Sequence, residues 1–509
     1  MKKTFTRVLC VLFALALIPF AAACSGNETS DDPLGESSAE TSSEPEYVLF
    51  SNLPDVKYPG ETVTFLVEGD YMDTYASIEV MPQENSYSTL KDAIQTRNDL
   101  VEEKFGVEIA EVRTEGYGDM MNKLRDNAMS GLSLYDIVMP YMGDAAKFAQ
   151  EGNLIDLQTL ENVHLDCDYY DQGSVQDLSI NHKNYFVTGD LSLLCYDVTH
   201  ALVFNKDTVT DNGLENPYDL VRNKQWTIDK LWEMAKKVTA DTDGEAGMSY
   251  TDTYGFIVNK NFVSSMFIGS GQRFSVKNEN DEPTIAVYNE QAVKVFDKIF
   301  RLVNDDTTSG QIDNMNGGFG HSAQVAGKTV WDAAREATAN KRTLFHSVSL
   351  SGILALGEYD CNFGVLPTPM FDDSQERYYC RVSTLYASCA GIPINAKNVE
   401  MSSVIMDAMF QASTNTVKDA YINTIMKERK IQDNDSEDML DIIFESRVYD
   451  FGSVFNWGGA SEFDVNSITG FMNEIAFSGT NTFVSRWDEI KDVVKSAMEG
   501  TIDAYRKND

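Results

Sequence analysis

Thr62-Val63-Thr64-Phe65-Leu66-Val67 opens the folded part of the chain as an apolar run, which predicts a buried β-strand that ends at Glu68-Gly69-Asp70. Apolar residues then recur near helical spacing over 90–105, and Gly106 stands where a helix commonly ends in the left-handed conformation. Val107-Glu108-Ile109 restarts strand character. The stretch therefore predicts a strand, a helix and a second strand.

The same alternation continues along the chain and contains no repeat of fixed period. Thr227 is placed to cap the start of one helix, with Asp229 in its first turn. Further strands are predicted at 134–139, 201–204 and 363–366, and further helices at 120–128, 145–150 and 289–303. Strands that alternate with helices predict the α/β class, with mostly parallel sheets flanked by helices.

The N-terminus predicts export. Lys2, Lys3 and Arg7 precede an apolar run over 8–20, which has the length of a signal-peptide core and is too short to span a bilayer comfortably. Small residues at 21–23 then precede Cys24, as in a lipoprotein cleavage site. We expect residues 1–23 to be a signal peptide, Cys24 to be lipidated, and residues 24–46 to form a flexible acidic tether.

Composition excludes several classes of partner and site. The chain has 79 acidic and 41 basic residues, a formal net charge of −38, which argues against binding to nucleic acid or to an anionic membrane surface. The roughly 460 residues beyond the tether exceed one compact core, so at least two domains are expected. The cysteines after Cys24 are scattered and contain no CxxC pair, which predicts free thiols rather than a disulfide framework or a zinc site.

Catalytic and cofactor motifs are missing from the sequence. It has no HExxH, GxSxG or phosphate-binding loop, and Gly317-Gly318-Phe319-Gly320 lacks the lysine that such a loop needs. Asp241-Thr242-Asp243-Gly244-Glu245 is similar to a calcium loop but lacks the remaining spacing, which favours a solvated turn. We therefore expect no enzyme activity, no cofactor and no metal.

Several segments, in their order along the chain, resemble the family 1 extracellular solute-binding proteins, which include the maltose-binding proteins. They are Glu102-Glu103-Lys104-Phe105-Gly106-Val107, Tyr135-Asp136-Ile137-Val138, Gly152-Asn153-Leu154-Ile155-Asp156-Leu157, Val203-Phe204-Asn205-Lys206, Trp226-Thr227-Ile228-Asp229 and Phe363-Gly364-Val365-Leu366-Pro367. Together these segments follow the order of the family over most of residues 60–425.

The resemblance implies a two-lobe, periplasmic-binding-protein-like type II fold, in which each lobe is a mostly parallel sheet flanked by helices and the ligand lies in the cleft between the lobes. It assigns 47–185 and 340–380 to the first lobe, and 190–335 and 385–509 to the second. It also implies a small-molecule ligand, a carbohydrate and in particular an oligosaccharide, that is delivered to the transmembrane permease subunits of an ABC importer. The protein would be extracytoplasmic and bound to the outer face of the cell membrane through its lipid.

Candidate ligand-binding residues follow from position, because ligands bind beyond the carboxyl ends of strands in open α/β sheets. Sugar rings also need flat aromatic side chains for their apolar faces and polar groups for their hydroxyls. The candidates at strand ends are Asp70, Tyr71, Tyr141 and Asp144; those at the first crossing between lobes are Asp190, Tyr196 and Asp197; and those where the resemblance implies a ligand contact are His346, Ser347 and Ser349.

Two further candidates have a second interpretation. Arg381, near a later crossing, bonds a ligand or pairs with acidic residues on the surface, and pairing is favoured. Trp457, followed by two glycines, either stacks on a ligand or fills the core of its own lobe, and the sequence favours neither.

Three alternatives to carbohydrate capture stay open at this point. The same scaffold could bind a peptide or an organic anion, the chain could be a lipid-anchored extracellular enzyme acting on glycans, or it could present a ligand to a membrane receptor. The fold alone does not decide among ligands.

Cys24→Ala should release the protein from membranes and leave it folded, because the anchor is separate from the folded part. Fractionation of cells that express the variant tests this. A variant that still sediments with membranes would contradict the lipid-anchor prediction.

Overall fold

The computed structural model describes residues 49–69, 75–116, 118–245, 248–315, 324–431 and 433–507, so Cys24 and the predicted tether lie outside the described residues. Strand β1 (Glu61–Val67) lies between β2 (Val107–Arg113) and β3 (Ile137–Met139) and pairs with both in parallel. The predicted strand, helix and second strand are confirmed. Gly106 ends the intervening helix with φ 69°, a left-handed conformation that glycine adopts without strain.

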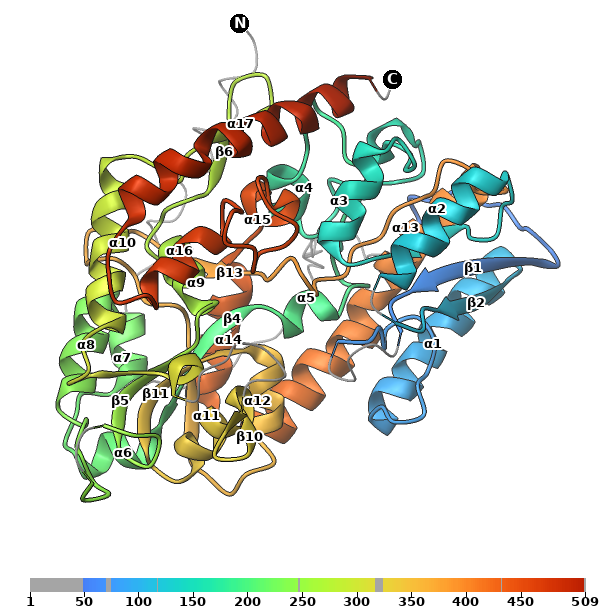
Figure 1. The fold of residues 1–509 in the computed structure, drawn as a ribbon. Helices are drawn as coiled ribbons and strands as arrows, with labels where there is room; N and C mark the ends of the chain where they lie inside the picture. The colour runs from blue at the N-terminus through green and yellow to red at the C-terminus, as the bar shows by residue number, and fades with distance from the viewer. Residues whose placement is uncertain are drawn as a thin grey trace, which may run out of the picture. The chain divides into compact units, whose positions relative to one another are not determined.

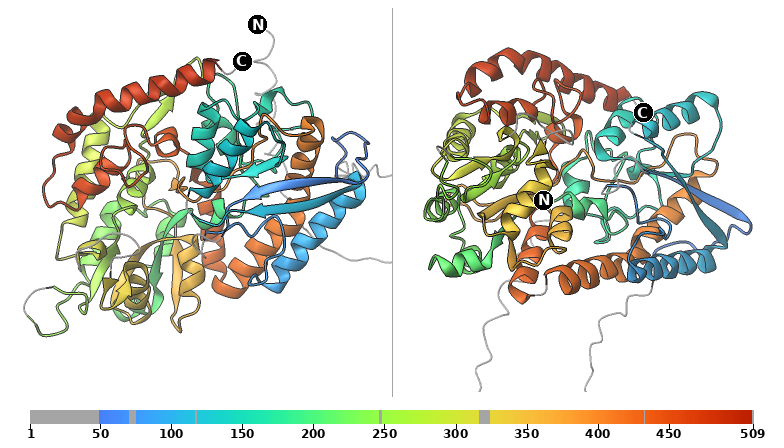
Figure 2. Two further views of the ribbon diagram at one scale, coloured as in Figure 1. Left: turned by 45° about the vertical axis from the view of Figure 1, so that its right-hand side comes forward. Right: turned by 60° about the horizontal axis from the view of Figure 1, so that its bottom comes forward.

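Helices cover this first sheet and complete what we call the first lobe. Helix α1 (Ser88–Phe105) packs against α13 (Val399–Ser413), and the two lie side by side in both views of Figure 2. Helices α2 (Asp119–Ser130) and α3 (Met142–Gln150) pack against each other elsewhere in this lobe. Apolar residues of β1, α1 and α13 share one buried cluster, which includes Phe65, Phe105 and Phe410.

A five-stranded sheet, in the order β12-β4-β11-β5-β8, forms the centre of what we call the second lobe (Figure 1). Its strands are β4 (His200–Asn205), β5 (Tyr254–Val258), β8 (Ser309–Gln311), β11 (Thr343–Ser349) and β12 (Phe363–Leu366). Strands β11, β5 and β8 pair in parallel, whereas β4 runs antiparallel to both of its neighbours. One reversed strand in an otherwise parallel sheet lets a late segment of the chain return beside an early one.

The helices of the second lobe follow the predicted alternation. They are α6 (Lys206–Asp211), α7 (Pro217–Arg222), α8 (Ile228–Lys236), α9 (Phe262–Gly269), α10 (Glu290–Val303), α11 (Val330–Ala339), α12 (Leu350–Leu356) and α14 (Asn434–Glu445). Thr227 caps α8, as predicted, because its side chain accepts a hydrogen bond from the Lys230 backbone N–H at 3.2 Å.

Shorter elements connect these parts. They are α4 (Gln172–Asp177), α5 (Leu194–Asp197), β6 (Ser275–Lys277), β7 (Pro283–Ile285), β9 (Gln324–Val325), β10 (Lys328–Thr329), β13 (Cys380–Arg381), β14 (Arg447–Val448), the 3₁₀ turns Leu157–Thr159 and Ile312–Asn314, and the π-helical segments Thr414–Lys418 and Ala420–Ile431. The π-helical segments continue α13 towards α14, so one long helical stretch joins the two lobes.

Pairing and packing in the structure differ from the predicted division into lobes at two segments. Residues 340–380 were expected in the first lobe, but their strands β11 and β12 hydrogen-bond to β4 in the second sheet. Residues 385–509 were expected in the second lobe; α13 packs on α1 of the first, whereas α14 packs on β12 and α16 on α9 of the second. Sheet hydrogen bonds decide the first placement and helix packing decides the second, and local sequence patterns carry no signal for either.

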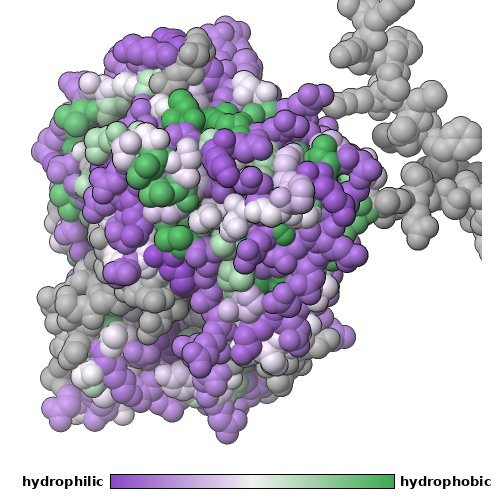
Figure 3. All heavy atoms as spheres, turned by 90° about the vertical axis from the view of Figure 1, so that its right-hand side faces the viewer, coloured by the Kyte–Doolittle hydropathy of each residue, from purple (hydrophilic) through white to green (hydrophobic). Residues whose placement is uncertain are grey.

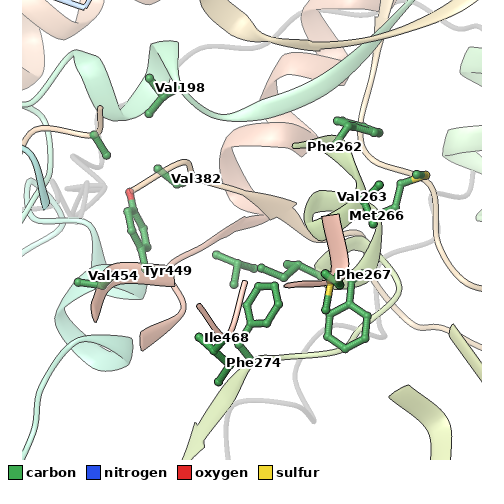
Figure 4. Packing of buried hydrophobic residues seen from close by; sticks show 14 of the residues in the cluster. Val198, Phe262, Val263, Met266, Phe267, Phe274, Val382, Tyr449, Val454 and Ile468 are labelled. Carbon is green, nitrogen blue, oxygen red and sulfur yellow. The ribbon is translucent and has the colours of Figure 1, made fainter. Parts of the chain in front are cut away.

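The C-terminal helices α15 (Phe451–Phe455), α16 (Gly470–Ala476) and α17 (Phe483–Lys507) pack on α3, α9 and α10. The large buried cluster beneath them includes Phe262 and Phe267 of α9 together with Phe274 and Ile468 (Figure 4). Trp457 belongs to this cluster, because its side chain is buried and its Nε1–H donates to Thr501 Oγ1 at 2.9 Å. The structure thus places Trp457 in the core.

The face shown in Figure 3 is mostly hydrophilic, with small scattered hydrophobic groups. Within the described ranges, no helix is both long enough and apolar enough to cross a membrane.

Glu68, directly after β1, is a buried carboxyl group with an unusual pKa. Its oxygens accept hydrogen bonds from Thr114 Oγ1 at 3.3 Å and from the Tyr141 backbone N–H at 3.4 Å. Burial, reinforced by the negative charge of Asp144, raises the pKa of Glu68 from 4.5 to about 8. Between these two values the folded protein holds a proton that the unfolded chain has lost, so this group lowers the stability as the pH rises through that range.

Glu68→Gln should therefore make the protein more stable than the wild type at pH 8, by roughly 1–3 kcal/mol, and the gain should vanish below about pH 4.5. Denaturant unfolding at a series of pH values measures it. Glu108→Gln, on an exposed position of β2, is the matched control for the loss of one negative charge. A variant that is less stable than the wild type at pH 8 would show that the charged form is the one that folding selects.

Candidate functional site

A cavity of about 490 Å³ lies between the two lobes. Its second-lobe wall forms where three strands of the sheet end or begin at one edge. Strand β11 ends at Ser349, which pairs with His200 at the start of β4, and β5 leads into Asn259. The cavity thus lies at the carboxyl ends of β5 and β11, where open α/β sheets bind ligands.

The first-lobe wall is aromatic. The rings of Tyr75 and Tyr386 stack with centroids 4.3 Å apart and planes inclined by 5°. Tyr141 stands behind them: its hydroxyl donates to the Tyr75 carbonyl oxygen at 2.9 Å, and its ring meets Tyr386 edge-on at 5.6 Å. The two walls meet where the hydroxyl of Tyr75 and Oγ of Ser351, on α12, lie 3.5 Å apart.

Further aromatic side chains line the second-lobe wall. Trp331 lies on α11 and is half-buried, and Phe262 at the start of α9 stacks on His200 at 6.1 Å. Flat rings on opposite walls can cover both apolar faces of a ring-shaped ligand.

Two histidines of the cavity are neutral. Burial lowers the pKa of His346 to about 3, aided by the positive charge of Arg335, and burial lowers the pKa of His200 to about 3, aided by Arg381. Each ring is anchored by Nδ1, His346 to Thr338 Oγ1 at 3.1 Å and His200 to Ser265 Oγ. A neutral imidazole offers one donor and one acceptor.

The charged groups of the cavity wall are paired. Glu462 forms a buried ion pair with Arg381 and accepts a hydrogen bond from Ser383 Oγ at 3.1 Å. Arg335 pairs with Asp332 at 2.5 Å. Because each charge already has an opposite charge beside it, the cavity favours a ligand without net charge.

Of the residues predicted from sequence, His346 and Ser349 line the cavity. Ser347 lies just behind it, where its Oγ accepts from Asn259 Nδ2 at 3.0 Å. Tyr141 supports the aromatic wall without lining it. Arg381 forms an ion pair with Glu462, and this partner is buried, whereas the favoured interpretation expected pairing with acidic residues on the surface.

The structure places the other predicted residues away from the cavity lining. Asp190 pairs with Lys418 at 2.8 Å, and the ring of Tyr196 lies 4.3 Å from the Arg447 guanidinium. Asp197 accepts from the Tyr421 hydroxyl, Asp144 pairs with Lys147 at 3.3 Å, and Trp457 is in the core. Asp70 and Tyr71 lie outside the described residues.

Sequence reasoning missed Tyr75, Asn259, Trp331 and Tyr386. Asn259 had a usable signal, because it directly follows the apolar run of β5 and so satisfies the strand-end rule used for the other candidates. Trp331 and Tyr386 had none, since their approach to the cavity depends on how α11 and the segment after β13 pack.

Among the described residues, one group of acidic side chains is close enough together to hold a metal ion. It consists of Asp241, Asp243 and Asp252, whose carboxylate oxygens lie within 4.8 Å of one another. Asp252 accepts backbone N–H bonds from Thr242 and Ser249 at 2.6 and 2.7 Å, so it organises the loop internally. The group lies outside the cavity lining.

Residues 98–425 match the family model described as bacterial extracellular solute-binding protein. No curated protein matches the chain at the sequence level. Structures of similar fold include the GacH receptor of Streptomyces glaucescens, solved without ligand and with acarbose (17% identity, 88% of this chain and 98% of that one, TM-score 0.50).

Two further structures of similar fold were solved with ligands of different kinds. MalE of Listeria monocytogenes, solved with maltose, shares 14% identity over 86% of this chain and 98% of its own, with a TM-score of 0.52. UgpB of Mycobacterium tuberculosis, solved with glycerophosphocholine, shares 16% over 81% and 96%, with a TM-score of 0.54. At these identities the likeness establishes the two-lobe binding-protein fold and leaves the ligand to be argued from the cavity.

Proposed function

We propose that the chain, which belongs to the family of bacterial extracellular solute-binding proteins, captures a carbohydrate, in particular an oligosaccharide, for an ABC importer. The proposal rests on one observation, the cavity between the lobes. Aromatic rings lie on both of its walls, and the charged side chains of its lining are paired with one another or with neighbours.

The cavity chemistry suits a sugar. Tyr75 and Tyr386 on one wall and Trp331 on the other offer flat surfaces for the apolar face of a pyranose ring. Asn259 and Ser349 stand among them as hydrogen-bonding groups for hydroxyls. The volume of about 490 Å³ is within the range of small-molecule sites.

The similar structures support the same ligand class without deciding it. GacH was solved with acarbose and MalE with maltose, whereas UgpB was solved with glycerophosphocholine, which is not a sugar. Arg335 could attract the phosphate of such a ligand, but its pairing with Asp332 opposes this. Binding of a charged ligand in place of a sugar would therefore contradict the proposal.

The family places the protein outside the cytoplasm. The further steps are part of the proposal: lipid on Cys24 holds the protein at the outer face of the membrane, and the loaded protein delivers its sugar to the transmembrane subunits of the permease. Capture followed by delivery requires binding rather than chemical conversion of the ligand.

A thermal-shift screen that includes maltose, maltotetraose, acarbose and glycerophosphocholine tests the ligand class, because a compound that binds the native state raises its melting temperature. Isothermal titration then measures affinity. Stabilisation by a glycan supports the proposal, and stabilisation by glycerophosphocholine alone contradicts it.

Two tryptophan variants locate the site. Trp331→Ala should weaken glycan binding by roughly 1–3 kcal/mol, because it removes a stacking surface, and should lower the melting temperature little. Trp457→Ala is the matched control: it should cost about 3–5 kcal/mol of stability and leave the affinity of the folded protein unchanged. The reverse pattern would move the binding site from the cavity to the surroundings of Trp457.

A further inference from the structure

On the cavity wall that β11 forms, the side chain of His346 is held by a hydrogen bond to Thr338, and this bond affects which ligands the cavity accepts. His346 lines the cavity with a ring that is almost fully buried, and its Nδ1 lies 3.1 Å from Thr338 Oγ1 on α11. The Thr338 hydroxyl also lies 3.0 Å from the Ala334 carbonyl oxygen, one turn earlier in the same helix.

A hydroxyl has one proton, so the two bonds of Thr338 constrain each other. If the hydroxyl donates to Ala334, then it accepts from His346, and Nδ1 carries the hydrogen. If it donated to Nδ1 instead, its own bond to the Ala334 carbonyl would be lost. The first arrangement makes one more hydrogen bond inside a buried region, where each unmade bond is costly.

The other ring nitrogen faces different surroundings. Within the described part of the chain, Nε2 of His346 has no hydrogen-bond partner, and it is not among the buried polar atoms that are sealed from solvent. In the neutral ring, hydrogen on Nδ1 leaves Nε2 with a lone pair. The nearby positive charge of Arg335 disfavours a second N–H on the ring, so it helps to keep the imidazole neutral with a single lone pair.

We infer that Thr338 is a positioning residue that holds His346 with hydrogen on Nδ1, so that Nε2 is a fixed acceptor on the cavity wall and selects ligands that present a donor hydroxyl there. The inference rests on the proposed function for the identity of the ligand, but the tautomer itself is a property of the free protein. A site with a fixed acceptor rejects analogues that lack the matching hydroxyl, because the acceptor is then buried unpaired.

Nitrogen-15 NMR of histidine-labelled protein at pH 7 tests the tautomer without any ligand. The chain has five histidines, so the His346 signals are assigned by their loss in His346→Gln, and those of His200 by their change in Ser265→Ala. The expected spectrum has hydrogen on Nδ1 of His346. Hydrogen on Nε2 would overturn the inference.

Two variants test the role of Thr338. Thr338→Val keeps the side-chain shape and removes the hydroxyl, so the His346 signals should move towards a mixture of tautomers. Thr338→Ser keeps the hydroxyl and should restore the wild-type spectrum. Unchanged His346 signals in Thr338→Val would overturn the inference even if its stability falls, because a purely structural role for Thr338 does not set a tautomer.

Titration with the glycan that binds best among maltose, maltotetraose and acarbose tests the effect on recognition. Thr338→Val should weaken binding by about 5- to 20-fold, the equivalent of one neutral hydrogen bond, whereas Thr338→Ser should bind within about 2-fold of the wild type. If Thr338→Val and the wild type bind the glycan with equal affinity, Nε2 of His346 is not an acceptor that selects the ligand. If none of the three glycans binds, the proposed function fails on that ground, and the NMR result still decides the tautomer.

Discussion

The pairing of β11 with β4 on one side and β5 on the other is the constraint on which the cavity depends. His346 is opposite Val203 of β4 and Ile257 of β5, so its place is fixed from both sides by backbone hydrogen bonds. The antiparallel pairing also brings the start of β4 beside the end of β11, which is why His200 and Ser349 share the wall. A shift in this register by one residue would turn these side chains to the opposite face of the sheet.

Burial and pairing of charge together decide what the cavity can hold. Withdrawal from water keeps His200 and His346 neutral, and the charges of Glu462 and Arg335 are balanced by Arg381 and Asp332. Removing one partner of the buried Arg381–Glu462 pair would leave an uncompensated buried charge, which is destabilising. A neutral ligand with apolar faces and several hydroxyls fits this environment at little electrostatic cost, whereas a charged ligand would need to displace an existing partner.

Local signals in the sequence predicted the parts of the fold that local interactions decide. The first strand, the left-handed Gly106 and the Thr227 cap depend on neighbouring residues and are confirmed. The placement of β11 and β12 depends on pairing with β4, which is more than 130 residues away in the sequence, and it differs from the predicted division into lobes. The position of Trp457 depends on Thr501 of α17, and that of Tyr386 on its stacking with Tyr75. The strand-end rule found Ser349 and could have found Asn259, but it gave no signal for aromatic residues that reach the cavity from helices and crossings.

We expect one ligand to contact both lobes in the cavity between them. Hydrogen–deuterium exchange with and without a saturating glycan measures this peptide by peptide. Protection should rise together in the segments around Tyr75 and Tyr386 on one wall and in the segment from His346 to Gly352 on the other. Protection confined to one lobe, or centred on residues outside the cavity lining, would contradict it.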